Sequence, residues 1–141
     1  MKSSRRRSRE FVLQGLYQWQ LTQTDTKTIA LNLAEGRGFD KIDSDYFSAL
    51  LDGAVKYAAV LEQELTPCID RKFSALSPVE RSILLLAGYE LMHRPEVPYR
   101  VVINEAVELA KSYGGTDGHK FVNGVLDKLA ARLRALEVKP V

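Results

Sequence analysis

Apolar residues recur every three or four positions along most of this chain, and that spacing determines the fold class that we expect. One series lies in residues 43–65 and comprises Phe47, Leu50, Leu51, Ala54, Ala58, Leu61 and Leu65. Another lies near the C-terminus and comprises Val122, Val125, Leu126, Leu129, Leu133 and Leu136. Side chains at this spacing share one face of an α-helix, whereas a strand would need alternating residues, which do not occur over a useful length. The sequence therefore predicts an all-α fold.

Capping and breaker residues divide the chain into about six or seven expected helices. The spacing predicts helices at about residues 5–23, 27–35, 43–65, 102–113 and 122–136, with a short helical turn near 70–73. Ser77, Pro78 and Glu80 combine an N-cap, a proline at the first helical position and a capping-box carboxylate, so another helix begins there. Residues 83–87 of that helix are apolar on nearly all sides, which predicts that it is the most buried one.

The length of 141 residues fits one domain, and we expect it to span the whole chain, 1–141. Within it we expect two packed helical bundles, at about residues 1–66 and 74–137. The longest apolar stretch, residues 83–89, is too short to cross a bilayer, and glutamines interrupt the apolar residues near the N-terminus, so neither a membrane span nor a secretory signal is expected. These features predict a cytoplasmic protein.

Few residues in this chain could carry out catalysis or bind a metal. Cys68 is the one cysteine and His93 and His119 are the two histidines, which leaves no disulfide and no zinc-binding set. The possible acid–base groups, Asp117, His119, Glu105 and Glu108, are not accompanied by a nucleophile motif, a phosphate loop or a metal-ligand pattern. We therefore expect no enzyme activity and no cofactor.

Positive charge is concentrated at the N-terminus. The first ten residues carry five basic side chains and one acidic one, a net charge of +4, and the others carry 15 basic and 17 acidic ones, a net charge of −2. Arg5, Arg6, Arg7 and Arg9 lie where a helix begins, and cations are unfavourable at that end of the helix dipole. The cluster is either a solvated end or a phosphate-binding site, because arginine binds phosphate oxygens bidentately. Tyr17, two turns along the helix, could then stack on an unpaired base or simply pack against the protein.

A second candidate site precedes the last helix. Asp117, Lys120 and Phe121 place a carboxylate, a cation and an aromatic ring close to a helix start, where free backbone N–H groups favour anions. The structural alternative is that Asp117 only caps the helix. Spacing alone favours the structural alternative.

Three segments resemble the NusB family of bacterial transcription antitermination factors. The residues that carry the resemblance are RRRSREFVLQGLYQWQ at 5–20, SPVERSILLLAGYELMHRPEVPY at 77–99 continuing through RVVINEAVELAKSYG to 114, and HKFVNGVLDKLA at 119–130. The resemblance implies an all-helical fold that binds the boxA element of ribosomal RNA operons together with the ribosomal protein NusE. It also implies action with the RNA polymerase elongation complex and other Nus factors, and it leaves open whether the free protein is a homodimer.

The resemblance also assigns residues to these partners. It implies RNA contacts at Arg5, Arg6, Arg7, Arg9, Tyr17, Asp117, Lys120 and Phe121, and a NusE contact at Glu80. Gly118 departs from the small polar residue expected beside Asp117. Two alternatives remain: an RNA-binding protein of ribosomal RNA processing or modification, and a protein–protein scaffold that does not touch RNA.

Overall fold

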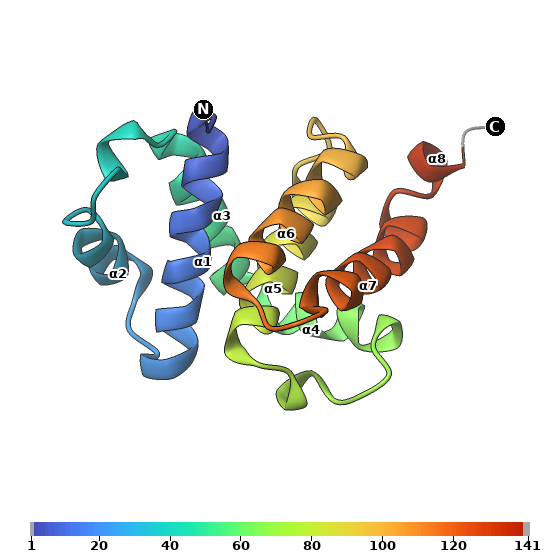
Figure 1. The fold of residues 1–141 in the computed structure, drawn as a ribbon. Helices are drawn as coiled ribbons and strands as arrows, with labels where there is room; N and C mark the ends of the chain where they lie inside the picture. Colours follow the sequence, from blue (N-terminus) through green and yellow to red (C-terminus); the bar gives the residue numbers. More distant parts are fainter. Residues whose placement is uncertain (1, 140–141) are drawn as a thin grey trace.

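The computed structural model describes residues 2–139, and within that part of the chain every regular element is helical (Figure 1). The eight α-helices are α1 (Ser4–Thr22), α2 (Thr26–Leu33), α3 (Ser44–Lys56), α4 (Ala58–Leu65), α5 (Pro78–His93), α6 (Tyr99–Tyr113), α7 (Gly118–Leu133) and α8 (Ala135–Val138). Three short 3-10 helices are η1 (Phe39–Lys41), η2 (Thr66–Cys68) and η3 (Phe73–Ala75). The all-α prediction is confirmed, and the described helices slightly outnumber the six or seven expected.

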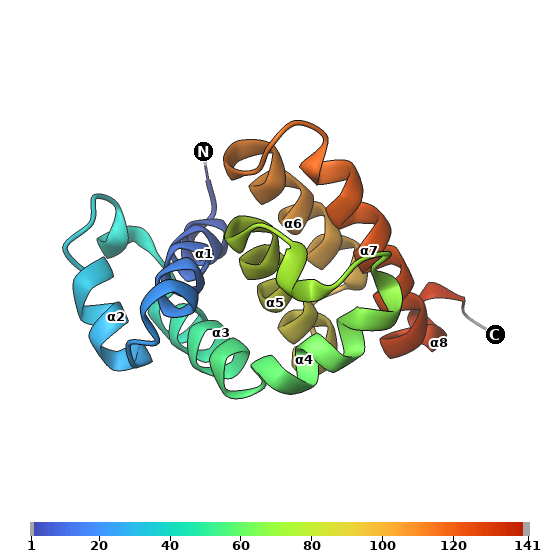
Figure 2. The ribbon, with the colours of Figure 1, turned by 90° about the horizontal axis from the view of Figure 1, so that it is seen from below.

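Two expected helices are each broken once, and this accounts for the difference in number. The helix expected over 43–65 is interrupted at Tyr57, whose φ and ψ of −101° and 15° separate α3 from α4. The ring of Tyr57 stacks on His93 at the end of α5, with the ring centroids 4.4 Å apart. Figure 2 shows α3 and α4 bending around α5 at this point. The break therefore lets one stretch of chain follow the surface of the central helix.

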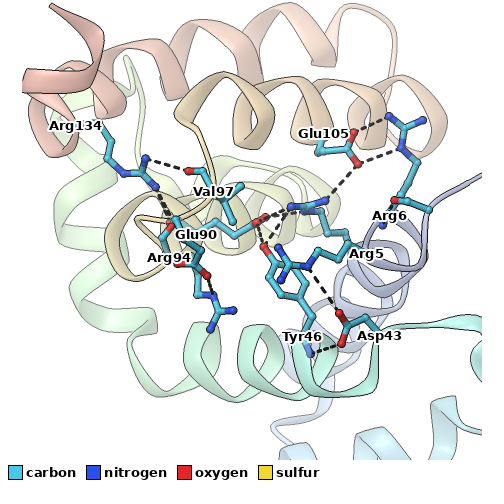
Figure 3. A network of polar contacts seen from close by, with 12 residues as sticks. Arg5, Arg6, Asp43, Tyr46, Glu90, Arg94, Val97, Glu105 and Arg134 are labelled. Carbon is cyan, nitrogen blue, oxygen red and sulfur yellow. Dashed lines mark hydrogen bonds and ion pairs between the residues drawn. The ribbon is translucent and has the colours of Figure 1, made fainter. Parts of the chain in front are cut away.

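The second break lies at Arg134, between α7 and α8. The Arg134 side chain is buried and donates hydrogen bonds to the backbone carbonyls of Glu90, Leu91, Arg94 and Val97, at the C-terminal end of α5 and just beyond it (Figure 3). Carbonyls at the end of a helix lack intrahelical partners, and Arg134 satisfies several of them. The expected turn near 70–73 also lies elsewhere, because the 3-10 turns are η2 and η3 and only Phe73 falls within the predicted range.

Helix α5 forms the centre of the molecule, as predicted. Ser77 accepts a hydrogen bond from the backbone N–H of Glu80, and the Glu80 carboxylate accepts one from the backbone N–H of Ser77, which completes the capping box. The residues from Ser82 to Gly88 are all buried. Helices α1, α3, α4, α6 and α7 all pack against α5.

One continuous cluster of buried apolar side chains includes residues of α1, α3, α5, α6 and α7. The division into bundles at about 1–66 and 74–137 therefore stays a prediction. Within residues 2–139, no helix combines the length and the apolar character needed to cross a membrane. For function, the useful feature of this arrangement is that α1 and α6 both pack on α5, and that Arg6 of α1 reaches Glu105 of α6.

Candidate nucleic-acid interface

The predicted arginine cluster forms the first two turns of α1. Ser3 is the N-cap, and its hydroxyl accepts a hydrogen bond from the backbone N–H of Arg6 at 3.1 Å. The first turn holds no acidic residue, so no carboxylate within that turn offsets the positive end of the helix dipole. The four arginines do not share one environment, because a helical turn directs neighbouring side chains to different faces.

Arg9 points into the protein and is 4% exposed. Its guanidinium donates to both carboxylate oxygens of Glu90, at 2.9 and 2.8 Å, and to the hydroxyl of Tyr46 at 3.2 Å. Burial acts to lower the pKa of Arg9, but the hydrogen bonds and charge of Glu90 outweigh burial and raise that pKa. Arg9 therefore joins α1 to α3 and α5 as a permanent cation.

The other three arginines remain at the surface or close to it. Arg6 forms a bidentate pair with Glu105 on α6, at 3.1 and 2.6 Å, and this pairing raises the pKa of Arg6. Arg5 lies over the ring of Tyr46, 4.2 Å from its centroid, and 3.7 Å from an Asp43 carboxylate oxygen. Arg7 is half-buried and forms no ion pair with any described residue. A phosphate would therefore meet Arg7 without competition and would compete with Glu105 for Arg6.

Two hollows follow the seam between α1 and α6. The first has polar walls and is lined by Lys2, Arg6, Arg9, Glu10, Glu105, Glu108, Leu109 and Ser112. The second, of about 370 Å³, is lined by Leu13, Gln14, Tyr17, Gln18, Leu33, Val79 and Tyr113. Tyr17 is 41% exposed and Trp19 is half-buried, so Tyr17 is the more accessible aromatic of α1. Tyr17 lies about three helical turns, or roughly 16 Å, from Arg6 on the same face of α1.

The second predicted site lies where α7 begins. Asp117 has a left-handed backbone, with φ of 63°, and its side chain makes no capping hydrogen bond. Its carboxylate instead lies 3.5 Å from the ammonium of Lys120, and both side chains are well exposed. Phe121 is half-buried, and the guanidinium of Arg71 lies over its ring. The cap interpretation of Asp117 is therefore not supported by hydrogen bonding.

Glu80 lies in the first turn of α5, close to the start of α7. One of its carboxylate oxygens serves the capping box of α5, and the other lies 3.8 Å from the point where a Cβ atom on Gly118 would stand. A small side chain at Gly118 would therefore make only ordinary contact with Glu80. The predicted partner contact and the second predicted RNA site are neighbours, although they lie 37 or more positions apart in the sequence.

Within residues 2–139, no three His, Cys, Asp or Glu side chains cluster as metal ligands would.

The NusB family model matches residues 6–131, which is most of the chain. The chain belongs to the NusB family.

Similar proteins agree with this assignment. The transcription antitermination protein NusB of Nitrosomonas europaea is 56% identical over 138 residues, covering 98% of this chain and 83% of the relative. That of Nitrosospira multiformis is 60% identical over 130 residues, covering 92% and 82%. Among solved structures, T. maritima NusB matches with a TM-score of 0.82 at 30% identity, with 94% of each chain covered. NusB in a crystal structure of the antitermination factors NusB and NusE with double-stranded RNA matches with a TM-score of 0.77 at 26% identity, covering 88% of this chain and 93% of that one.

In this NusB-family chain the structure also reveals two residues that the sequence did not single out. Tyr113, at the end of α6, lines the same hollow as Tyr17. Arg71, between η2 and η3, covers the ring of Phe121. Neither carries a motif, and the only signal for Tyr113 was an aromatic residue at the end of a helix before two glycines.

Proposed function

We propose that this NusB-family protein is a transcription antitermination factor that binds boxA RNA of ribosomal RNA operons together with NusE. In this role it acts in the cytoplasm, with the RNA polymerase elongation complex and other Nus factors, and helps the polymerase read through terminators. The role is one of binding rather than catalysis. The observation that carries the proposal is the single face of α1 that presents Arg6 at one end and an exposed Tyr17 at the other, beside the seam with α6.

On this face, different side chains would bind the phosphates and the bases of the RNA. Arg5, Arg6 and Arg7 would bind phosphates, because each phosphate that they neutralise releases counterions. Tyr17 would stack on an unpaired base in the apolar hollow, as aromatic side chains do when they read single-stranded RNA. Arg9 is buried and paired, and its proposed role is to hold this turn of α1 in place rather than to touch RNA.

The start of α7 would supply a second RNA contact through Asp117 and Lys120, both exposed. Glu80 would contact NusE from the neighbouring start of α5. Because Glu80 lies beside Gly118, NusE and RNA would meet at one place on the protein. Such adjacency supports coupled binding, in which each partner strengthens the binding of the other by the same factor.

The proposal is tested by fluorescence anisotropy with a boxA RNA and a scrambled RNA of equal length, each with and without NusE. We expect boxA RNA to bind more tightly than the scrambled RNA, and NusE to increase that preference. Equal affinity for both RNAs would indicate a general RNA-binding protein of ribosomal RNA processing or modification. Binding of NusE without measurable RNA affinity would indicate a scaffold, and either result would overturn the proposal.

A further inference from the structure

Arg71 places a planar cation beside the start of α7. It lies in the segment between η2 and η3, which crosses the face of the molecule turned to the viewer in Figure 2. The guanidinium carbon of Arg71 lies 4.7 Å from the centroid of the Phe121 ring, and the Arg71 side chain is 50% exposed. Phe121 thus lies beneath a guanidinium that is half exposed to solvent, and the two are called the stacked pair here.

Arg71 also contacts its neighbour in the sequence. Its Nε donates a hydrogen bond to a carboxylate oxygen of Asp70 at 3.0 Å, and that contact lowers the pKa of Asp70, so the carboxylate stays charged at neutral pH. Among the described residues, the terminal nitrogens of Arg71 have no hydrogen-bond partner. They are free to donate to a ligand while the plane of the guanidinium is held against Phe121.

Other cations surround this stacked pair. Lys128 lies two helical turns after Phe121 on α7, and its charge contributes to the lowered pKa of Asp70. Lys120 is exposed one position before Phe121, and Lys72 is exposed beside Arg71. Arg71 and Lys120 are each paired with a carboxylate, Asp70 and Asp117, so the positive charge left over near Phe121 comes from Lys72 and Lys128. The Arg71 guanidinium over Phe121 offers a flat surface for a ring.

We propose that Arg71 and Phe121 form a base-stacking platform, on which an unpaired RNA base stacks against the outer face of the Arg71 guanidinium. Guanidinium planes stack on nucleobases as aromatic rings do, and they are more weakly hydrated than an ammonium group. Phe121 is half-buried and covered by Arg71, so it supports the platform from below rather than meeting the base on that face. This inference rests on the RNA-binding function proposed above, and it adds Arg71 to the second RNA contact at the start of α7.

The platform is tested by binding of boxA RNA to Arg71→Lys, Arg71→Ala and the matched control Arg132→Ala. Arg132 is also exposed and ion-paired, and removing it changes the net charge equally, but it lies 11 residues, or roughly 16 Å, along α7 from Phe121. We expect Arg71→Ala to weaken binding roughly 5- to 150-fold, which is the range for loss of one base stack. Arg71→Lys should weaken binding within the same range while keeping the wild-type salt dependence, and Arg132→Ala should change it by less than about twofold.

A second measurement reports stacking directly. 2-Aminopurine placed in turn at each position of the boxA RNA should show one position whose fluorescence is quenched by the wild type and is restored by Arg71→Ala and by Phe121→Leu. Because the two residues act as one unit, the double variant should bind RNA little worse than either single variant. Circular dichroism melting of each variant shows whether the fold is retained.

Three results would overturn the platform. The first is an Arg71→Ala variant that binds RNA as tightly as the wild type. The second is an Arg71→Lys variant that binds RNA as tightly as the wild type, which would leave only a charge contact. The third is an Arg71→Ala variant that loses NusE affinity but keeps its RNA affinity, which would make this a protein contact. In each case the wild type still binds boxA RNA, so the proposed function survives. If the wild type itself fails to bind boxA RNA, the proposed function and the platform both fail.

Discussion

Arg9 and Glu90 form a buried, bidentate ion pair that joins the arginine turn of α1 to the central helix α5. Both side chains are almost fully buried, and Tyr46 on α3 completes the contact by donating its hydroxyl to Glu90. Removing two charges from water is costly, and here the cost is offset by close geometry and several hydrogen bonds. The pair therefore fixes how the surface arginines of the same turn are presented.

The first prediction follows from this pair. Arg9→Met should lower the free energy of unfolding by roughly 3–5 kcal/mol, because it leaves Glu90 buried and unpaired. The double variant Arg9→Met with Glu90→Met should be less destabilised than Arg9→Met alone, since it removes the stranded charge as well. Urea denaturation measures both. A loss below about 1 kcal/mol for Arg9→Met would contradict a structural role for the pair.

The pair also shows how far the sequence could predict the site. Arg5, Arg6, Arg7 and Arg9 form one cluster in the sequence, and the partner that draws Arg9 inward lies 81 positions away. A local signal did exist, because Arg9 precedes Val12 by three residues and so falls on the apolar stripe of α1. Charge clustering alone could not separate the buried arginine from the exposed ones.

The same limit applies to the fold. Helix α5 could be predicted because its start is encoded locally in Ser77 and Glu80 and its burial in one apolar run. The breaks at Tyr57 and Arg134 could not, because they depend on contacts with the C-terminal end of α5, which is distant in the sequence. Arg71 was not predicted for the same reason, because its proposed role depends on its contact with Phe121, which is distant in the sequence.

A second prediction concerns the pairing of Arg6 with Glu105. Glu105→Gln should strengthen RNA binding and steepen its salt dependence, because it frees a cation that the wild type holds in a bidentate pair. Arg7→Ala should flatten the salt dependence by roughly one phosphate contact, since Arg7 has no ion-pair partner among the described residues. Anisotropy titrations at several salt concentrations measure both slopes. Unchanged slopes in both variants would exclude this turn from phosphate binding.

A third prediction tests Tyr17 as a base contact. Tyr17→Ala should reduce RNA affinity by roughly 1–3 kcal/mol, whereas Tyr17→Phe should retain most of it, because stacking needs the ring and not the hydroxyl. Tyr17 is well exposed, so the melting temperature should change little. The exposed Leu21, one turn further along α1, offers a control, and Leu21→Ala should leave RNA affinity unchanged. Equal RNA affinity of Tyr17→Ala and wild type would remove Tyr17 from the interface.

A fourth prediction separates the two roles of Glu80. Glu80→Gln keeps the capping hydrogen bond and removes the charge, so it should lower NusE affinity with little change in melting temperature. Glu80→Ala should lower NusE affinity and also lose on the order of 1 kcal/mol of stability with the cap. Because Glu80 lies beside Gly118, the coupling between NusE and RNA should fall in both variants. Normal NusE affinity in Glu80→Gln would leave capping as the only role.

The last prediction uses the ionisation of Tyr46. Burial, followed by the charge of Glu90, raises the pKa of Tyr46 above its ordinary value of about 10, although Arg9 opposes the shift. Above pH 10 the unfolded chain therefore releases a proton that the folded protein keeps, and stability falls as pH rises. The stabilisation from this shift is fully present below about pH 10 and disappears as pH rises through the folded pKa. The guanidinium groups of Arg5 and Arg94 also lie over the Tyr46 ring, with their central carbons 4.2 and 5.1 Å from its centroid.

Tyr46→Phe provides the measurement. At pH 7 it should cost roughly 1–3 kcal/mol, because Glu90 loses a buried hydrogen-bond donor. Above pH 10 the difference between wild type and Tyr46→Phe should narrow, because only the wild type carries the ionisation that favours unfolding. Urea denaturation of both proteins at pH 7, 9 and about 10.5 gives this difference directly, and ionisation of all other groups cancels in it. A difference that stays constant across this range would show that Tyr46 ionises alike in the folded and unfolded states, and that the contact with Glu90 does not hold its proton.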